Sequence, residues 1–365
     1  MKPDTAAEFV TKFRYAEDIA AKKNTVSKSQ KYEILEAHSS LLITKTISPL
    51  IYSSLERVCV NLHILPEKIH LYVFASNEIN AKCYRGIENV FVVILSSALV
   101  TLLEETELDF VIGHELGHLL FDHTSEIQDS SPEGMRLSRA KELSVDRLGL
   151  VASRDLDITL RAIIKTISGL NSKYLNFNIA EFMDQLRHFD LDASDILGQS
   201  THPSFLIRAR ALMLFSSSDV YQDLFQESGK DITKIDVMIK REMDKYIDKS
   251  YNEQTIKLKD NFNFWLTCFA VASHQSLTKD AQDYISKTYG NQRLQKLKSL
   301  VKGRSSENIK LIINKKLLQA SDELASYRSI SMNQDIDSTV TYLSKRFNID
   351  DLDTMVINFY KSDNS

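Results

Sequence analysis

Apolar residues recur at three- and four-residue spacing over much of the chain, which is the period of an amphipathic helix. The strongest run is ELDFVIGHELGHLLFDH, residues 107–123, where Thr106 is a suitable N-cap and acidic residues occupy the first turn. Residues 98–105 predict a short helix before it, and residues 29–65 predict two helices that meet near Pro49. This part of the chain is therefore expected to be largely helical.

Two stretches break this helical period. Residues 68–76 and 89–95 are rich in β-branched and aromatic residues, so we expect two strands there, on either side of a turn that Gly86 helps to form. After about residue 216 the helical period returns, with residues 262–271 as an aromatic-rich core helix. The chain is thus expected to adopt an α+β fold that is mostly α, with a helical N-terminal segment (residues 1–40), a domain with a small sheet (residues 41–215) and an all-helical C-terminal domain (residues 216–365).

Three of the nine histidines of the chain fall within ten residues of the strongest helix, between positions 114 and 123. Residues four apart share one face of a helix, so His114 and His118 can aim their imidazoles at one metal ion. Glu115 follows the first of them and can take a proton from an attacking water, which is the H-E-x-x-H arrangement of zinc hydrolases. Two histidines that simply pack on an ordinary helix would also fit these letters, so the motif alone leaves both interpretations open.

A third metal ligand is available further along the chain. Glu142 follows His118 by 24 residues on another helical stretch, RAKELSVDRLGL, and Asp146 lies one turn later on the same face. Glu142 would complete a three-ligand site with a fourth position left for water, and Asp146 could accept the other ring N–H of a ligand histidine. Taken alone, these two acids could equally belong to a plain surface helix.

Several separate blocks match the pattern of a known family in order and spacing. They are Asn80-Ala81 with Gly86, residues 89–105, residues 107–123, ELSVDRLG from Glu142 and THPSFLIRARAL from Thr201. Over roughly residues 45–215 the chain resembles the M48 metallopeptidases, a family that includes a bacterial membrane protease and the CAAX prenyl protease. The resemblance implies a gluzincin-type metallopeptidase domain whose H-E-x-x-H motif lies on the active-site helix.

The resemblance also implies a role for each residue of the central motifs. The ligands of one zinc ion per chain would be His114, His118 and Glu142. Glu115 would be the general base, and Asp146 would hold a ligand histidine from behind.

Further positions are implied with less definite roles. His202 and Arg208 lie where the family has an H-P-x-x-x-x-R block, so His202 would steady the oxyanion and Arg208 would hold a carboxylate or the substrate. Val145 departs from the alanine that is usual before the family's aspartate. His123 also matches a family position, but it lies five residues after His118 and so points about 140° away around a continuing helix, which favours a structural role.

Composition limits the settings in which such a protein could work. The 365 residues are 43% apolar, enough for a sizeable core and two domains, while a formal net charge of −4 gives no bulk attraction for nucleic acid or anionic membranes. Three dispersed cysteines support neither a disulfide framework nor a thiolate metal site.

The most apolar window, residues 90–103, spans about 14 residues, short of the roughly 20 that cross a bilayer, so no membrane insertion is expected. The N-terminus lacks an apolar signal region, so we expect a cytoplasmic protein, and delivery into another cell is compatible with the same observation.

The sequence therefore predicts a soluble zinc-dependent peptidase, with its peptide substrate bound along an edge strand at Val90 to Leu95. Two alternatives remain open. The core could be catalytically silent or latent, with the C-terminal helices recruiting a partner protein, or the zinc site could hydrolyse a compound other than a peptide. Residues 1–30 could cover the cleft as an inhibitory arm or pack on the catalytic domain.

Overall fold

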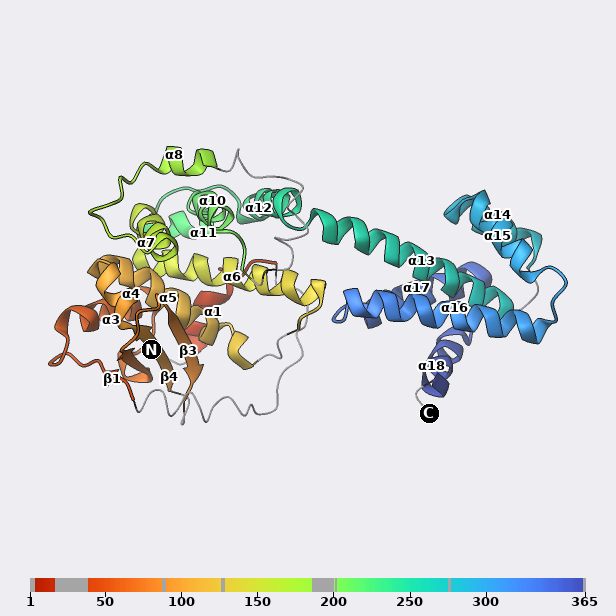
Figure 1. The fold of residues 1–365 in the computed structure, drawn as a ribbon, viewed down its shortest axis with the longest axis horizontal. Coiled ribbons are helices and arrows are strands. Elements are labelled where there is room, and N and C mark those ends of the chain that lie inside the picture. The colour runs from red at the N-terminus through yellow and green to blue at the C-terminus, as the bar shows by residue number, and fades with distance from the viewer. Residues whose placement is uncertain are drawn as a thin grey trace. The chain divides into compact units, whose positions relative to one another are not determined.

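The computed structural model describes residues 4–16, 39–86, 90–125, 129–185, 200, 202–274 and 277–363. They fall into two compact units (Figure 1). The first unit comprises residues 1–128 and 135–249, and the second comprises residues 129–134 and 250–365. Described helices dominate both units and one small sheet completes the first, which confirms the expected α+β, mostly α, class.

The sheet of the first unit has four strands in the order β1-β2-β4-β3. The strands are β1 (Leu41–Leu42), β2 (Ile69–Phe74), β3 (Ala81–Arg85) and β4 (Phe91–Ser96). Strand β4 pairs in parallel with β2 and antiparallel with β3. The strand expected at the edge, Val90 to Leu95, is therefore interior, because its run of apolar residues is buried on both faces in the manner of a central strand. The edge strands of the described sheet are β1 and β3, and β3 is the one next to β4.

Two further predictions were wrong. Residues 81–85 form strand β3 where a turn was expected, and Leu41–Leu42 form strand β1 where helix was expected. Residues 81–85 are mostly of intermediate exposure, with Lys82 exposed and Tyr84 buried, and this polar run carries a weaker strand signal than β2 or β4. The helix that follows β1, α3 (Pro49–Leu62), begins at Pro49, whose fixed φ suits the first helical position.

Among the described helices of the first unit, α5 (Glu105–Leu120) contacts both the sheet and neighbouring helices. Helix α5 lies between β3 and β4 on one side and α7 on the other (Figure 1). The other helices are α1 (Asp4–Thr11), α4 (Ser97–Leu102), most of α6 (Pro132–Ser153), α7 (Leu156–Ser168), α8 (Ile179–Asp184), α10 (Phe205–Phe215), α11 (Asp219–Gln222) and α12 (Ile232–Tyr246).

Two buried or half-buried ion pairs fix α5 to its neighbours. Arg57 of α3 donates two hydrogen bonds, of 2.8 and 2.9 Å, to the carboxylate of Asp109 on α5. Lys165 of α7 donates a 2.7 Å hydrogen bond to Glu107 of α5, and both of these side chains are buried. Since an isolated buried charge is expensive, each partner holds the other in place.

The described part of the N-terminal segment, residues 4–16, packs into the apolar core of the first unit. Val10 and Phe13, at the end of α1 and just after it, are fully buried, and Phe13 packs edge-on against Phe215. Arg14 donates to the backbone oxygen of Phe121 at 2.9 Å. Residues 4–16 are thus a packed part of the fold, while the remainder of the expected arm lies outside the described residues.

Residues 216–249 pack with the first unit, so the division does not fall at the boundary expected after residue 215. Helix α12 contributes to a buried cluster with α6 and α10 because its apolar stripe faces them. That stripe consists of Ile235, Ile239 and Met243.

The second unit is built from helices around its own apolar core. They are α13 (Lys249–His274), α14 (Lys279–Tyr289), α15 (Asn291–Val301), α16 (Ser306–Tyr327), α17 (Met332–Phe347) and α18 (Leu352–Asp363). The aromatic stretch of α13 supplies core side chains such as Phe262 and Leu266. The segment 129–134 belongs here because buried Glu133 accepts the backbone N–H groups of Ile330 and Ser331, each at 3.0 Å.

No helix among the described residues of either unit combines the length and the apolar content that crossing a bilayer requires.

The buried pair between Lys165 and Glu107 should be a major contributor to the stability of the first unit. Replacing Lys165 with methionine leaves Glu107 buried without its cation, so we expect the free energy of unfolding to fall by about 3–5 kcal/mol. Urea denaturation followed by circular dichroism measures this. The matched control is Arg161→Met, which removes an exposed ion pair with Asp157 on the same helix and should cost less than about 1 kcal/mol. Equal losses in the two variants would contradict the assignment.

Candidate metal centre

The site is built on a close contact between α5 and α6. Gly113 and Gly117 of α5, each immediately before a histidine of the H-E-x-x-H motif, face α6. A β-carbon at Gly113 would lie 2.3 Å from that of Ala152, and one at Gly117 would lie 3.0 Å from that of Val145. Only glycine fits at Gly113 without displacing the backbone, and the departure at Val145 is accommodated because its side chain occupies the space over Gly117. The two helices are thereby brought close together.

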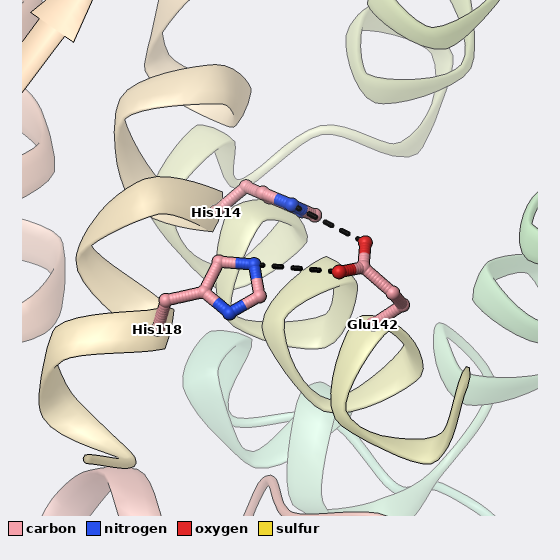
Figure 2. Close-up of side chains that lie close together, drawn as sticks. All are labelled: His114, His118 and Glu142. Atoms are coloured by element: carbon pink, nitrogen blue, oxygen red, sulfur yellow. Dashed lines mark ion pairs between the residues drawn. The ribbon is translucent and has the colours of Figure 1, made fainter. Parts of the chain in front are cut away.

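This contact brings the three expected ligands to one point, as Figure 2 shows. The Nε2 atom of His114 lies 3.6 Å from Oε2 of Glu142, and Nε2 of His118 lies 3.5 Å from Oε1 of the same carboxylate. One ligand atom from each of the three residues falls within 4.8 Å of the others. Two imidazole nitrogens and a carboxylate at this separation form a donor set that suits zinc.

Asp146 holds His114 from behind. Its carboxylate lies 3.0 Å from Nδ1 of His114, so that Nδ1–H donates and the lone pair of Nε2 faces the ligand cluster. Arg208 donates two hydrogen bonds to the same carboxylate, of 2.6 and 2.7 Å. Burial would raise the pKa of Asp146, but the charge and hydrogen bonds of Arg208 hold it well below its usual value. Arg208 therefore holds a carboxylate of the protein itself.

His123 holds His118 in a similar way, which corrects the direction expected for its side chain. Helix α5 ends at Leu120, and Asp122 adopts a left-handed φ of 65°, so the chain bends instead of continuing the helix. The Nδ1 atoms of His118 and His123 then lie 3.2 Å apart, leaving Nε2 of His118 toward Glu142. Burial and the neighbouring His114 lower the pKa of His118 to about 3, which keeps it in the neutral form that binds metals.

Glu115, the expected base, lines the same cavity as the ligands. Burial raises the pKa of its carboxyl above the usual value, while the neighbouring His114 opposes the rise. A base whose pKa is raised toward neutral pH accepts a proton more readily. The geometry thus places a proton acceptor beside the three ligands.

His202 lies at the mouth of the site, with 63% of its side chain exposed. Its Nδ1 is 3.1 Å from Oε2 of Glu142, and this hydrogen bond raises the pKa of His202. Burial opposes ionisation of Glu142, but the bond from His202 and the charges of the two ligand histidines lower its pKa to about 2. Glu142 is therefore a carboxylate at any pH near neutrality.

The cavity around these residues has a volume of about 470 Å³. One wall carries the polar groups described above, and Ala81, the first residue of β3, forms another part of the lining with the preceding Asn80. The rest is mainly apolar and consists of Ile79, Leu99, Phe110, Val111, Ile163 and Ile167, with Thr166. Such a cavity can hold a side chain next to the ligand cluster.

Sequence comparison finds a match to a known peptidase family over part of the chain. The model of peptidase family M48 matches residues 49–130, the segment that contains α3, the sheet strands β2 to β4 and all of α5. That segment, and not the whole chain, carries the match to peptidase family M48. Glu142, Asp146, His202 and Arg208 lie beyond the segment matched by the M48 model.

A curated protein with a similar sequence is the plastoglobule-localized metallopeptidase 48, chloroplastic, of Arabidopsis thaliana. The two are 26% identical over 171 residues, which cover 39% of this chain and 50% of that protein. The chain thus spans about half the length of the curated relative that it matches.

Two features of this site were not predicted from the sequence. The contact of His123 with His118 depends on a bend at Asp122, and the residue types there do not predict this bend. The close helix contact had a visible signal, because Gly113 and Gly117 are four residues apart and therefore share one helical face.

The hydrogen bond from His114 to Asp146 should matter for metal binding. Replacing Asp146 with asparagine removes the charge that holds the ring, so we expect metal affinity to fall by about 10- to 100-fold. Competition with a chromophoric zinc chelator measures this, with circular dichroism to verify the fold. Asp157→Asn, an exposed change on α7, should leave the affinity unchanged. Wild-type affinity in Asp146→Asn would show that the ring needs no such partner.

Proposed function

We propose that the chain is a zinc-dependent metallopeptidase that hydrolyses internal peptide bonds, with Glu115 as general base. The observation that carries the proposal is the convergence of His114, His118 and Glu142, with the far nitrogen of each histidine already hydrogen-bonded. The match of residues 49–130 to the model of peptidase family M48 supports it. A zinc ion held by these three side chains would act as a Lewis acid toward the substrate carbonyl and the attacking water.

The side chains around the ligands divide the remaining chemistry. Glu115 takes a proton from the attacking water and passes it to the leaving amine, a task for which its raised pKa is suited. His202, with Nδ1 on Glu142, keeps its other ring nitrogen for the oxyanion of the tetrahedral intermediate. Arg208 acts indirectly, through Asp146, because both of its hydrogen bonds go to that carboxylate.

The peptide would bind along β3 in place of the strand first expected. Strand β3 is paired with β4 and is the last strand in the order of the described sheet, and an extended peptide adds to a sheet at such a position. Ala81 of β3 lines the cavity that contains the ligands. A peptide added to this edge uses backbone hydrogen bonds, so side-chain preference would come from the cavity wall.

Glu115→Gln is the direct test of the proposed reaction. The amide cannot accept the proton, so cleavage of an unbiased peptide library should fall by about 10²- to 10⁴-fold while zinc content stays equal to wild type. Glu181→Gln, an exposed change on α8, is the matched control and should cleave normally.

The same experiment separates the proposal from its alternatives. A wild type that binds zinc and cleaves no peptide or denatured protein would favour a silent core that recruits a partner. Hydrolysis of esters or non-peptide amides that depends on Glu115, without peptide cleavage, would favour a different substrate class. Cleavage that persists in Glu115→Gln would contradict the assigned base.

The apolar wall predicts a preference for a large apolar side chain in the substrate. Ile167 lies at the rim with 45% of its surface exposed, so Ile167→Glu should shift the kcat/KM ratio of basic over apolar peptides by about tenfold. Leu170→Glu places the same charge on a residue that is 41% exposed and outside the cavity lining. Equal shifts in both variants would indicate a general charge effect and not a specificity pocket.

We also propose a reducing compartment, such as the cytoplasm, as the setting. All three cysteines are free thiols in the structure, and Cys59 and Cys268 are buried in separate cores.

A further inference from the structure

The second unit contains a cavity of about 500 Å³ that has no part in the proposed reaction. Helices α13, α15 and α16 form most of its lining, each with side chains three or four residues apart and therefore on one face. The apolar members are Cys268, Val271 and Ala272 of α13, Leu277 just before α14, Leu297 and Val301 of α15, and Ile309 and Ile313 of α16.

The lining changes from apolar at the floor to polar at the rim. Cys268, Leu297 and Ile313 are each less than 5% exposed and form the floor. Among the described lining residues, the polar side chains are Ser273, Ser306 and Lys310, and the latter two are exposed. The cavity therefore offers an apolar interior with a polar opening.

Lys310 gives the opening a positive charge. It is the one charged residue in the described lining, and no described carboxylate forms an ion pair with it. Ser306 and Lys310 lie four apart in the first turns of α16, at the positive end of that helix. A ligand that fills the cavity would meet a cation at the rim and no acid in the lining.

We propose that this cavity binds a fatty acid, with the hydrocarbon chain on the apolar floor and the carboxylate at Lys310. The volume is in the range of small-molecule sites, about 300–1,000 Å³. A purely apolar compound would leave the cation unused, and a phosphorylated or sugar-like compound would leave polar groups unpaired against the floor. The amphipathic acid matches both parts of the lining.

The test uses the full chain and a fluorescent fatty acid, dansylundecanoic acid, below its micelle concentration. Trp265 is the sole tryptophan and lies on α13 three residues before Cys268, so a ligand in the cavity should quench it by energy transfer to the dansyl group. We expect saturable transfer at one equivalent per chain. Unlabelled saturated fatty acids should displace the probe, with about fourfold higher affinity for each additional buried methylene until the cavity is filled.

Variants test the two halves of the site separately. Ala272→Phe fills the cavity and should abolish saturable transfer. Lys310→Glu should weaken binding by about tenfold and Lys310→Arg should preserve it, because only the sign of the charge at the rim decides. Lys315→Glu is the matched control, an exposed lysine of the same helix outside the lining, and should bind as wild type. Circular dichroism verifies that each variant is folded.

Several results would overturn the proposal. Absence of saturable transfer would show that the cavity does not bind the fatty acid. Equal binding in wild type and Lys310→Glu would show that Lys310 does not hold the carboxylate. Displacement by dodecanol as strong as by dodecanoic acid would show that the carboxylate does not contribute to binding. Displacement by amphipathic peptides but not by fatty acids would assign the cavity to a partner protein.

Discussion

The close contact between α5 and α6 is the constraint on which the metal centre depends. Histidines four apart on α5 and a glutamate on α6 can share one ion only if the two helix backbones approach closely. Gly113 and Gly117 permit that approach, and Val145 and Ala152 fill the space that side chains would otherwise occupy. A larger residue at either glycine would separate the ligands before it altered any ligand itself.

The surroundings of this contact hold each ligand in a single orientation. His114 is backed by Asp146 and Arg208, and His118 by His123, so both rings turn Nε2 toward Glu142. The ion pairs of Arg57 and Lys165 fix α5 on its other faces. The result is a pre-organised donor set, and a metal ion would gain affinity because little ordering remains to be done when it binds.

The sequence predicted the parts of the site that depend on local periodicity. The four-residue spacing of His114 and His118 and the motif around Glu142 were sufficient because each lies within a single helix. Features that depend on tertiary contacts were not predictable in this way. Strand β3 is the last strand of the described sheet and carries few apolar residues, so its pattern resembled a turn. The apolar run of β4 reflected burial on both faces and not an edge position. The predicted direction of the His123 side chain was wrong because the helical period of the sequence does not show that α5 ends at Leu120.

X-ray diffraction recorded at the zinc absorption edge from crystals of the zinc-loaded protein tests the central claim most directly. The account predicts one strong anomalous peak per chain, about 2.0–2.2 Å from Nε2 of His114, Nε2 of His118 and a carboxylate oxygen of Glu142. A peak at other residues, or no peak at this cluster in zinc-saturated crystals, would contradict it.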